Sequence, residues 1–371
     1  MKLLYISNAR LPTERAYGLQ IMKTCEALAE AGVDLELVIP LRINHLAADP
    51  FAYYGIRPSF KVATLEAPDF VRSGPLGFLV SALWFSEKVR WLPAFRGADV
   101  IYSRDALVLA QYLLLGKRLV FEAHARPSFV SKIVARRALR TVVISEGLRT
   151  AYAAAGVAPE RIVVAPDAVD ERLFDGVPDR AAARGALGFP RDKRIVLYAG
   201  HLYPRKGAAA LAEAAALVPD ALFIFLGGTP EDIEAFGGKW GSRVNVRIIG
   251  HVPHEGVPVY LRAADILVLP NSGKDEDSTR FTSPMKLFEY IASGTPIVAS
   301  DLPSIREVLA GDSAYLVPPD DPEALAAGIR DALADSQAAR DKSVKALSLA
   351  ASHTWAARAR RIIAALKDKD P

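Results

Sequence analysis

Cysteine is nearly missing from the 371-residue sequence: Cys25 stands alone, so the chain can form no intramolecular disulfide and no thiolate metal cluster. This scarcity fits a reducing compartment, and we expect a cytoplasmic protein. No stretch approaches the roughly 18 uninterrupted apolar residues of a membrane-spanning helix. The apolar run after Met1 is too short for a signal peptide. The net charge of +4 is too small to indicate nucleic-acid binding, although it is compatible with anionic substrates or a membrane surface.

The composition is that of an ordinary globular protein of two or three domains, with 51% hydrophobic and 24% charged residues. The first residues predict a buried strand at Lys2–Ile6, a loop that ends at Gly18, a helix over Leu19–Ala31 and a second strand at Leu35–Ile39. This order predicts a parallel sheet. Gly18 would let the backbone approach a ligand, although a lone glycine is more often a simple turn residue.

The same layout starts again after 171–192, a stretch rich in glycine, proline, arginine and aspartate that we interpret as a linker. Ile195–Ala199 predicts a strand, and a loop then leads from Gly200 to Gly207 and into an alanine-rich helix. Two such starts predict an α/β protein with two Rossmann-like domains that face each other across a central cleft.

The most distinctive stretch is a loop, a helix and a buried strand that begin at Ser283. Ser283 can cap the helix, and Pro284 fits its first position. The amides of Met285 and Lys286 would then lie at the positive end of the helix dipole and could bind an anion. Glu289 would place a carboxylate further along, so the stretch suits a nucleotide. From this stretch alone, an ordinary capped helix is an equally good interpretation.

Other polar residues stand where strands and loops end. Arg205 and Lys206 lie just before this alanine-rich helix of the second domain, and this loop position favours a diphosphate over plain surface charge. Glu122 and His124 follow a predicted strand at 118–121, and ligands of open α/β sheets bind beyond the carboxyl ends of strands. We predict that His124 bonds a sugar hydroxyl or shuttles a proton, in preference to a capping or surface role.

Two patterns could hold a metal ion, and we predict that neither does. The acidic run at 275–277 has the Asp-x-Asp spacing that can hold a divalent ion against a diphosphate. It lies several residues after its strand, however, and we interpret it as a solvated loop. His251 and His254 lack a clear third ligand for zinc.

Residues 41–75 predict no regular structure, and an aromatic-rich helix follows at Leu76–Phe95. This helix could lie on a membrane interface, but we predict that its apolar stripe faces the core. The basic stretch Ser131–Arg140 could likewise meet phospholipid or an anionic acceptor. We interpret it as a solvated helix face that carries Lys132, Arg136, Arg137 and Arg140.

Taken together, these motifs resemble those of the GT-B glycosyltransferases of the large retaining family four, over nearly the whole chain. Five segments carry the resemblance: the glycine loop Asn8–Gly18, the histidine motif Glu122–His124, the phosphate loop Gly200–Gly207, the second half of the paired-glutamate motif with its strand at Ser283–Ala299, and the C-terminal motif His353–Trp355. The resemblance implies an acceptor domain at 1–172, a nucleotide-sugar donor domain at 173–352 and, at 353–371, a helix that crosses back to the first domain.

The resemblance also implies roles for single residues. His124 would contact the donor sugar near the reacting centre, Lys206 would bind phosphate and Glu289 would bind the ribose hydroxyls. The donor-binding residues would further include Gly18, Arg205, Arg280, Thr282, Ser283, Pro284 and Met285.

The implied reaction is metal-independent, retaining transfer by a hexosyltransferase-type enzyme of cell envelope glycan biosynthesis. Sugar passes from a UDP- or GDP-linked donor to a glycan, lipid or small-molecule acceptor. We expect no cofactor and no nucleic-acid partner. A peripheral contact with the inner face of the membrane remains open.

The chain departs from the family pattern at three places. Phe281 stands where the first glutamate of the paired motif binds sugar hydroxyls, a role that backbone groups or Arg280 could fill. His201 replaces a common phosphate-binding arginine, and Asp167-Ala168 replaces a common Asn-Gly. Two alternatives stay open: a nucleotide-sugar epimerase of the same fold, and a sugar-nucleotide binding protein without catalysis.

Overall fold

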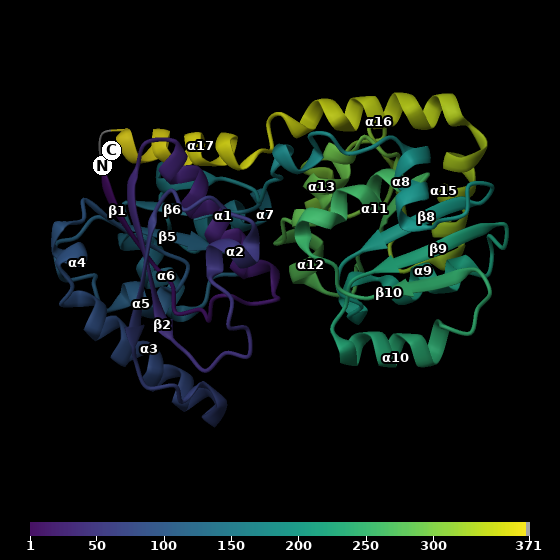
Figure 1. Ribbon diagram of the computed structural model, residues 1–371. Helices are drawn as coiled ribbons and strands as arrows, with labels where there is room; N and C mark the ends of the chain where they lie inside the picture. Colours follow the sequence, from purple (N-terminus) through teal and green to yellow (C-terminus); the bar gives the residue numbers. More distant parts are fainter. Residues whose placement is uncertain (369–371) are drawn as a thin grey trace. The chain divides into compact units, whose positions relative to one another are not determined.

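The computed structural model describes residues 1–368, apart from the side chain of residue 72, and the chain forms two compact units (Figure 1). The first unit contains Met1–Asp167 and the chain from Trp355 onward, and the second contains Ala168–Thr354. Each has one parallel sheet with helices on its faces, which confirms the α/β, Rossmann-like architecture predicted from the repeated pattern. None of the helices within the described chain is long and apolar enough to cross a bilayer.

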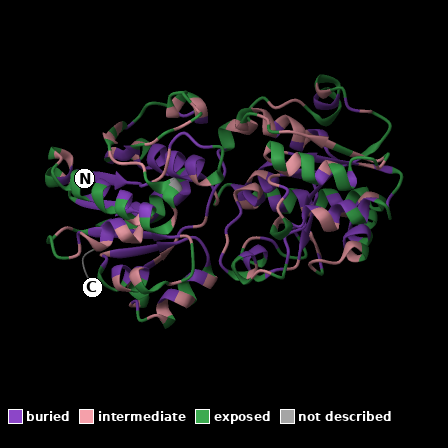
Figure 2. Cartoon of the chain, turned by 90° about the horizontal axis from the view of Figure 1, so that it is seen from below, coloured by how far each residue is buried: buried purple, intermediate pink, exposed green. Residues whose placement is uncertain are grey.

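The sheet of the first unit has seven parallel strands in the order β3-β2-β1-β4-β5-β6-β7. Its central strands are apolar runs buried on both faces, as a covered parallel sheet requires (Figure 2). The strands are β1 (Lys2–Ile6), β2 (Asp34–Leu41), β3 (Lys61–Glu66), β4 (Val100–Ser103), β5 (Leu119–Ala123), β6 (Arg140–Val143) and β7 (Ile162–Val164). The helices are α1 (Ala16–Glu30), α2 (Pro50–Tyr54), α3 (Gly74–Arg90), α4 (Pro93–Gly97), α5 (Ala106–Ala110), α6 (Phe129–Arg137) and α7 (Glu146–Ala154).

The last helix, α17 (Trp355–Lys367), also belongs to the first unit and packs against α1. Its apolar stripe, with Ile362, Ile363 and Leu366, is buried. Arg358 lies on the same buried stripe. The C-terminal helix therefore returns to the first unit, as the resemblance implied.

The sheet of the second unit has six parallel strands in the order β10-β9-β8-β11-β12-β13. Successive residues of β8 alternate between two hydrophobic cores: Leu197 faces one and Val196 and Tyr198 face the other, so both faces of the sheet are covered. The strands are β8 (Arg194–Ala199), β9 (Ala221–Leu226), β10 (Val246–Ile249), β11 (Ile266–Leu269), β12 (Ile297–Ser300) and β13 (Tyr315–Val317). The helices are α8 (Arg180–Leu187), α9 (Ala208–Ala215), α10 (Pro230–Trp240), α11 (Val257–Ala263), α12 (Glu276–Arg280), α13 (Met285–Ser293), α14 (Pro303–Arg306), α15 (Pro322–Ala334) and α16 (Ser336–Ala350).

Strand order reverses once in each sheet, between β1 and β4 in the first unit and between β8 and β11 in the second. Loops that leave two such strands diverge at the carboxyl edge of a sheet and leave room for a ligand. In the second unit the two loops touch: a Cβ added at Gly207 would lie 1.6 Å from the carbonyl oxygen of Pro270. Gly207 also has a φ of 74°, so only glycine fits this position without strain.

Two sequence predictions about the first unit are wrong. Residues 41–75 contain α2 and β3, and β3 was missed because it is a half-exposed edge strand without a continuous apolar run. Arg140 does not lie on a solvated helix face. It begins β6, is buried, and donates from NH1 to the carbonyl oxygen of Leu139 at 2.9 Å.

The prediction that the apolar stripe of 76–95 faces the core is also wrong for much of α3. Its buried face consists mainly of small side chains, and the large apolar residues Leu76, Phe78, Val80, Leu83 and Trp84 are exposed. Close packing explains why small side chains form the buried face. A Cβ added at the inward-facing Gly77 would lie 2.0 Å from the carbonyl oxygen of Phe70.

Candidate functional site

The β8–α9 loop of the second unit carries two of the predicted site residues. Pro204–Lys206 forms a single 3₁₀ turn that Gly207 closes by donating its N–H to Pro204, at 3.0 Å. The carbonyl of Arg205 accepts from the N–H of Ser272 in the loop after β11, at 3.2 Å. The Arg205 side chain is exposed, whereas that of Lys206 is half-buried. The turn is therefore held against the neighbouring loop at the point where the strand order reverses.

Lys206 shares this edge of the sheet with Lys286 of α13. The Lys286 Nζ is buried and, within the described chain, has no hydrogen-bond partner. It lies 4.0 Å from the ring centroid of Tyr198 and 3.5 Å from where a Cβ on Gly200 would be. Burial lowers the pKa of Lys286 well below its usual value, and the charge of Lys206 lowers it further. Burial and the charge of Arg205 also lower the pKa of Lys206. This edge thus holds cations that favour an anion.

Glu289 lies almost one turn after Lys286, since helical residues three apart share a face. Its Oε1 is 2.7 Å from Nε2 of His254, which orients the carboxylate. The helix begins one residue later than predicted: Pro284 is its N-cap, with extended backbone, and no side chain caps it, so the prediction that Ser283 caps the helix is wrong. The first turn closes where Leu287 N–H donates to the Pro284 carbonyl at 2.9 Å, and the amides of Met285 and Lys286 precede that bond.

The segment before α13 contains the other predicted donor residues. Arg280 is exposed and ends α12, and its guanidinium carbon lies 6.0 Å from the Phe281 ring centroid. Phe281 and Ser283 are buried and Thr282 is half-buried. The run at 275–277 is not a plain solvated loop as predicted, because Asp275 caps α12 by accepting from the Asp277 N–H at 3.1 Å. Within residues 1–368, no three histidine, cysteine or acidic side chains converge on a metal position.

A second polar cluster lies in the first unit, around Glu122 at the end of β5. Four side chains contact its fully buried carboxylate: Gln20 Nε2 at 2.6 Å, Tyr102 OH at 2.5 Å, His124 Nε2 at 2.6 Å and an Arg358 nitrogen at 2.7 Å. Burial alone would raise the pKa of Glu122, but Arg358 and His124 hold it well below its usual value. Glu122 is therefore an ionised carboxylate inside the unit.

His124 follows β5 and keeps 18% of its side-chain surface exposed. Burial, together with the charge of Arg104, lowers the pKa of its imidazole to about 4, so His124 is neutral at pH 7. Arg104 follows β4 and donates to Gln20 Oε1 at 2.6 Å, which ties the strand-reversal point of this sheet to the cluster.

Packing against Tyr54, and not a ligand, explains why position 18 is a glycine. A Cβ added there would lie 2.0 Å from the hydroxyl oxygen of Tyr54. That hydroxyl donates to the Thr13 carbonyl at 2.8 Å and accepts from the Thr13 N–H at 2.7 Å. Gly18 thus lets Tyr54 hold the loop that precedes α1.

Sequence reasoning missed three residues of these clusters. Lys286 was considered for its amide only, although its spacing from Glu289 put both side chains on one helix face. Arg358 interrupts an apolar stripe between Trp355 and Ile362, and a cation in such a stripe signals a buried partner. Asn271 follows β11 and gave no signal, yet both of its amide atoms are buried and lack a hydrogen-bond partner in the part of the chain that the structure describes.

Two protein-family models match the chain, one in each of its two parts. Residues 19–173 match the family model of "Glycosyltransferase Family 4", and residues 193–335 match that of "Glycosyl transferases group 1". The chain is 25% identical to a D-inositol 3-phosphate glycosyltransferase of Thermobispora bispora, over 92% of this chain and 87% of the relative. It is 33% identical to a phosphatidyl-myo-inositol mannosyltransferase of Mycobacterium tuberculosis, over 45% of this chain and 43% of the relative.

Solved structures share the fold. HepE of Anabaena in complex with UDP is similar with a TM-score of 0.79 and 18% identity, over 100% of both chains. The sucrose-phosphate synthase of Thermosynechococcus elongatus is similar with a TM-score of 0.78 and 22% identity, over 99% of this chain and 98% of the other.

Proposed function

The chain belongs to the family 4, group 1 glycosyltransferases and is a hexosyltransferase-type enzyme of the GT-B fold, and from this premise we propose that it transfers a sugar, with retention and without a metal ion, from a nucleoside diphosphate sugar to a hydroxyl acceptor. The observation that carries the proposal is the pairing of Lys206 with Lys286 at the strand-reversal point of the second unit. A buried ammonium without a partner is costly unless an anion completes it. A diphosphate supplies that anion.

In this reaction the bond from the anomeric carbon to the diphosphate breaks and a bond from the acceptor oxygen forms on the same face. The acceptor proton passes to an oxygen of the departing diphosphate, so the products are a glycoside and a nucleoside diphosphate. Negative charge grows on the diphosphate as its bond breaks. Lys206, Lys286 and the first amides of α13 would stabilise that charge more in the transition state than in the ground state.

The remaining donor contacts follow from the same placement. Glu289, oriented by His254, would accept from two ribose hydroxyls. Phe281 offers no hydrogen bond to the sugar, so the sugar hydroxyls would depend on backbone groups at Thr282 and Ser283 and on the exposed Arg280. We assign the second unit to the donor and the first to the acceptor. The resemblance further implies that His124 contacts the donor sugar. UDP is our first choice of nucleotide because structures of the same fold hold it.

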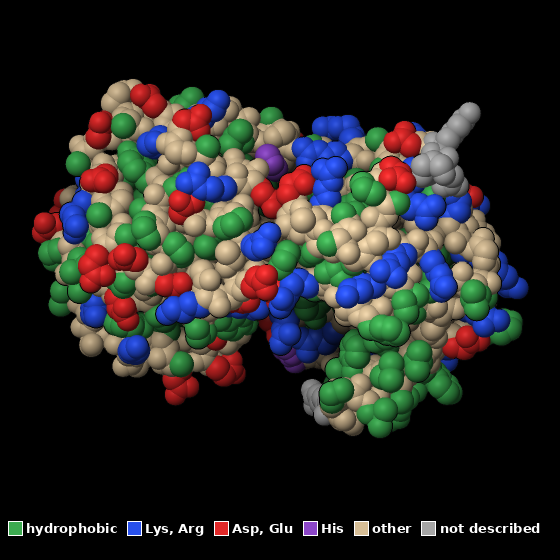
Figure 3. All heavy atoms as spheres, turned by 180° about the vertical axis from the view of Figure 1, so that it is seen from behind, with side chains coloured by type: hydrophobic (Ala, Val, Ile, Leu, Met, Phe, Trp, Pro, Cys, Tyr) green, Lys and Arg blue, Asp and Glu red, His purple; other side chains and the backbone are tan. Residues whose placement is uncertain are grey.

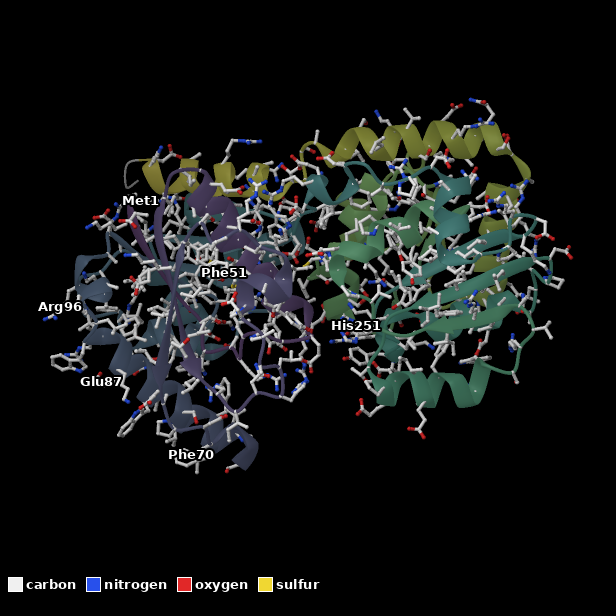
Figure 4. All side chains as sticks on the ribbon, viewed as in Figure 1. Met1, Phe51, Phe70, Glu87, Arg96 and His251 are labelled. Carbon is white, nitrogen blue, oxygen red and sulfur yellow. The ribbon has the colours of Figure 1, made fainter. Side chains whose placement is uncertain are left out.

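For the acceptor we propose an inositol-bearing molecule, because curated relatives carry that chemistry in their names. A membrane-anchored form is favoured by α3. Hydrophobic side chains gather on the surface that α3 forms (Figure 3), and Trp84 is 52% and Leu76 72% exposed. Phe70, labelled in Figure 4, is 49% exposed and lies beside this helix, where its N–H donates to Ser81 Oγ at 2.9 Å. An exposed apolar face of this kind suits the interfacial layer of a bilayer. It would hold the enzyme at the inner, cytoplasmic face of the membrane.

A transfer assay tests the proposal. UDP-glucose, UDP-N-acetylglucosamine and GDP-mannose are each incubated with inositol 3-phosphate or with phosphatidylinositol vesicles, and products are identified by mass spectrometry and by the NMR coupling at the anomeric carbon. The proposal predicts a glycoside with the donor's anomeric configuration. Conversion of the donor alone to its epimer would contradict glycosyl transfer and would identify the protein as an epimerase. Tight nucleotide binding without product from any pair would indicate a binding protein.

A further inference from the structure

The buried carboxylate of Glu122 dictates which nitrogen of His124 carries a proton. An ionised carboxylate only accepts hydrogen bonds, and its Oε1 lies 2.6 Å from His124 Nε2. Nε2 must therefore donate. In a neutral imidazole the other nitrogen, Nδ1, is then an acceptor. The His124 side chain is 18% exposed and its Nε2 contacts the buried carboxylate, so we infer that a ligand reaches the ring from the Nδ1 side.

Arg358 is the group that keeps this carboxylate ionised. Its side chain is 2% exposed and donates to Glu122 at 2.7 Å, to Thr24 Oγ1 at 3.2 Å and to the Pro166 carbonyl at 3.1 Å. Three acceptors from separate parts of the unit fix the planar guanidinium. Without Arg358, burial would favour the protonated form of Glu122, and the proton would then be shared with His124.

We propose that Arg358 of α17 is a positioning residue for His124: through Glu122 it holds the imidazole neutral with its proton on Nε2, and so presents Nδ1 as the acceptor for a sugar hydroxyl. This inference rests on the proposed function for the identity of the hydroxyl. It makes the C-terminal helix a contributor to the site and gives His124 the role of a hydrogen-bond acceptor, in place of the proton shuttle that the sequence left open.

Removal of Arg358 has a defined effect on the ring. If Glu122 becomes protonated it donates to Nε2, and the imidazole proton moves to Nδ1. If the proton passes to His124 instead, both nitrogens carry one. In either case Nδ1 ceases to be an acceptor, and a hydroxyl that donates to it loses its partner.

The test is ¹⁵N NMR of histidine-labelled full-length protein at pH 7, with the His124 signals assigned by their loss in His124→Asn. Wild type should show a protonated Nε2 and an unprotonated Nδ1. Arg358→Gln should protonate Nδ1, and Arg358→Lys, which keeps the charge, should restore the wild-type pattern in part. The matched control is Arg184→Gln, which breaks a buried ion pair with Asp265 in the second unit, at 2.5 Å, and should leave His124 unchanged.

A buried ion pair that loses one partner can unfold the protein. The double variant Glu122→Gln/Arg358→Met removes both charges at similar volume and keeps the experiment decisive, because the amide introduced at position 122 can donate to Nε2 and move the proton to Nδ1. In both variants kcat for sugar transfer should fall about tenfold, the worth of one hydrogen bond, while UDP binding is unchanged.

Wild type with a protonated Nδ1, or variants that keep the wild-type ring signals, would overturn the positioning role. Variants that shift the ring signals without loss of kcat would overturn the acceptor role of Nδ1. The NMR readout needs no substrate, so a wild type that forms no product contradicts the proposed function separately.

Discussion

Lys286 Nζ lies 4.0 Å from the ring centroid of Tyr198 and, among the described residues, has no hydrogen-bond partner. The aromatic ring gives the ammonium a weak cation–π contact. This does not replace the water that burial removes, and Lys206 adds repulsion. Such an arrangement is unfavourable in the empty protein and becomes favourable when an anion binds. The position of Lys286 against Tyr198 therefore supports the proposed anion site.

Replacement of Lys286 should change UDP binding and the stability of the empty protein in opposite directions. Lys286→Met should weaken UDP binding about 10- to 100-fold, the worth of one charge-assisted hydrogen bond. It should also stabilise the empty protein by about 0.5–2 kcal/mol, because a buried ammonium is removed. Calorimetry and thermal unfolding measure the two effects. Lys345→Met, which removes an exposed lysine of α16, is the control and should change neither.

UDP binding should depend on pH through the same lysine. Burial and Lys206 lower the pKa of Lys286 in the empty protein, and Glu289 opposes them. The bound diphosphate raises that pKa, so a proton is taken up on binding between the two values. Affinity therefore falls as the pH rises through this window. Titrations in buffers of different ionisation enthalpy measure the uptake. Equal uptake in wild type and Lys286→Met would assign the proton to another group.

The exposed face of α3 predicts a membrane contact. Trp84→Asp should lower co-sedimentation with phosphatidylinositol vesicles about tenfold, because a half-exposed indole that enters the interface contributes about 1.5 kcal/mol. Val344→Asp, at an apolar residue of α16 that is 67% exposed, is the control and should sediment like wild type. Equal sedimentation of the Trp84→Asp and wild-type proteins would remove the membrane from the proposal.

Gly207 should tolerate no side chain. Gly207→Ala places a Cβ 1.6 Å from the Pro270 carbonyl oxygen at a φ of 74°, so the β8–α9 loop must move. We expect a loss of about 1–3 kcal/mol in unfolding free energy together with weaker UDP binding. Gly238→Ala in α10 meets nothing within 4 Å and should stabilise the protein by about 0.5–1 kcal/mol. Equal behaviour of the two variants would refute this close contact.

Local patterns in the sequence predicted the fold because parallel strands that are covered on both faces form continuous apolar segments. Strand β8 is an example, and such segments are visible in the sequence itself. They missed β3, whose half-exposed edge position dilutes that signal. They also misplaced the apolar face of α3, because close packing at Gly77 reverses the usual rule that large residues face inward.

The polar clusters show a different limit. Glu122 and His124 were found at a strand end, but Arg358 reaches Glu122 across 236 positions of sequence, and only the folded chain brings the two together. Lys286 was visible in its motif, whereas the buried state of its ammonium depends on Tyr198 and Gly200 from another strand and loop.

The most direct test of the central claim is calorimetric titration of UDP, GDP, ADP and TDP into wild type, Glu289→Ala and Lys206→Ala. The donor site proposed for the second unit predicts that one nucleotide, UDP as first choice, binds wild type and that both variants weaken this binding at least about tenfold. Binding of no nucleotide, or equal binding by all three proteins, would contradict the assignment of the donor site.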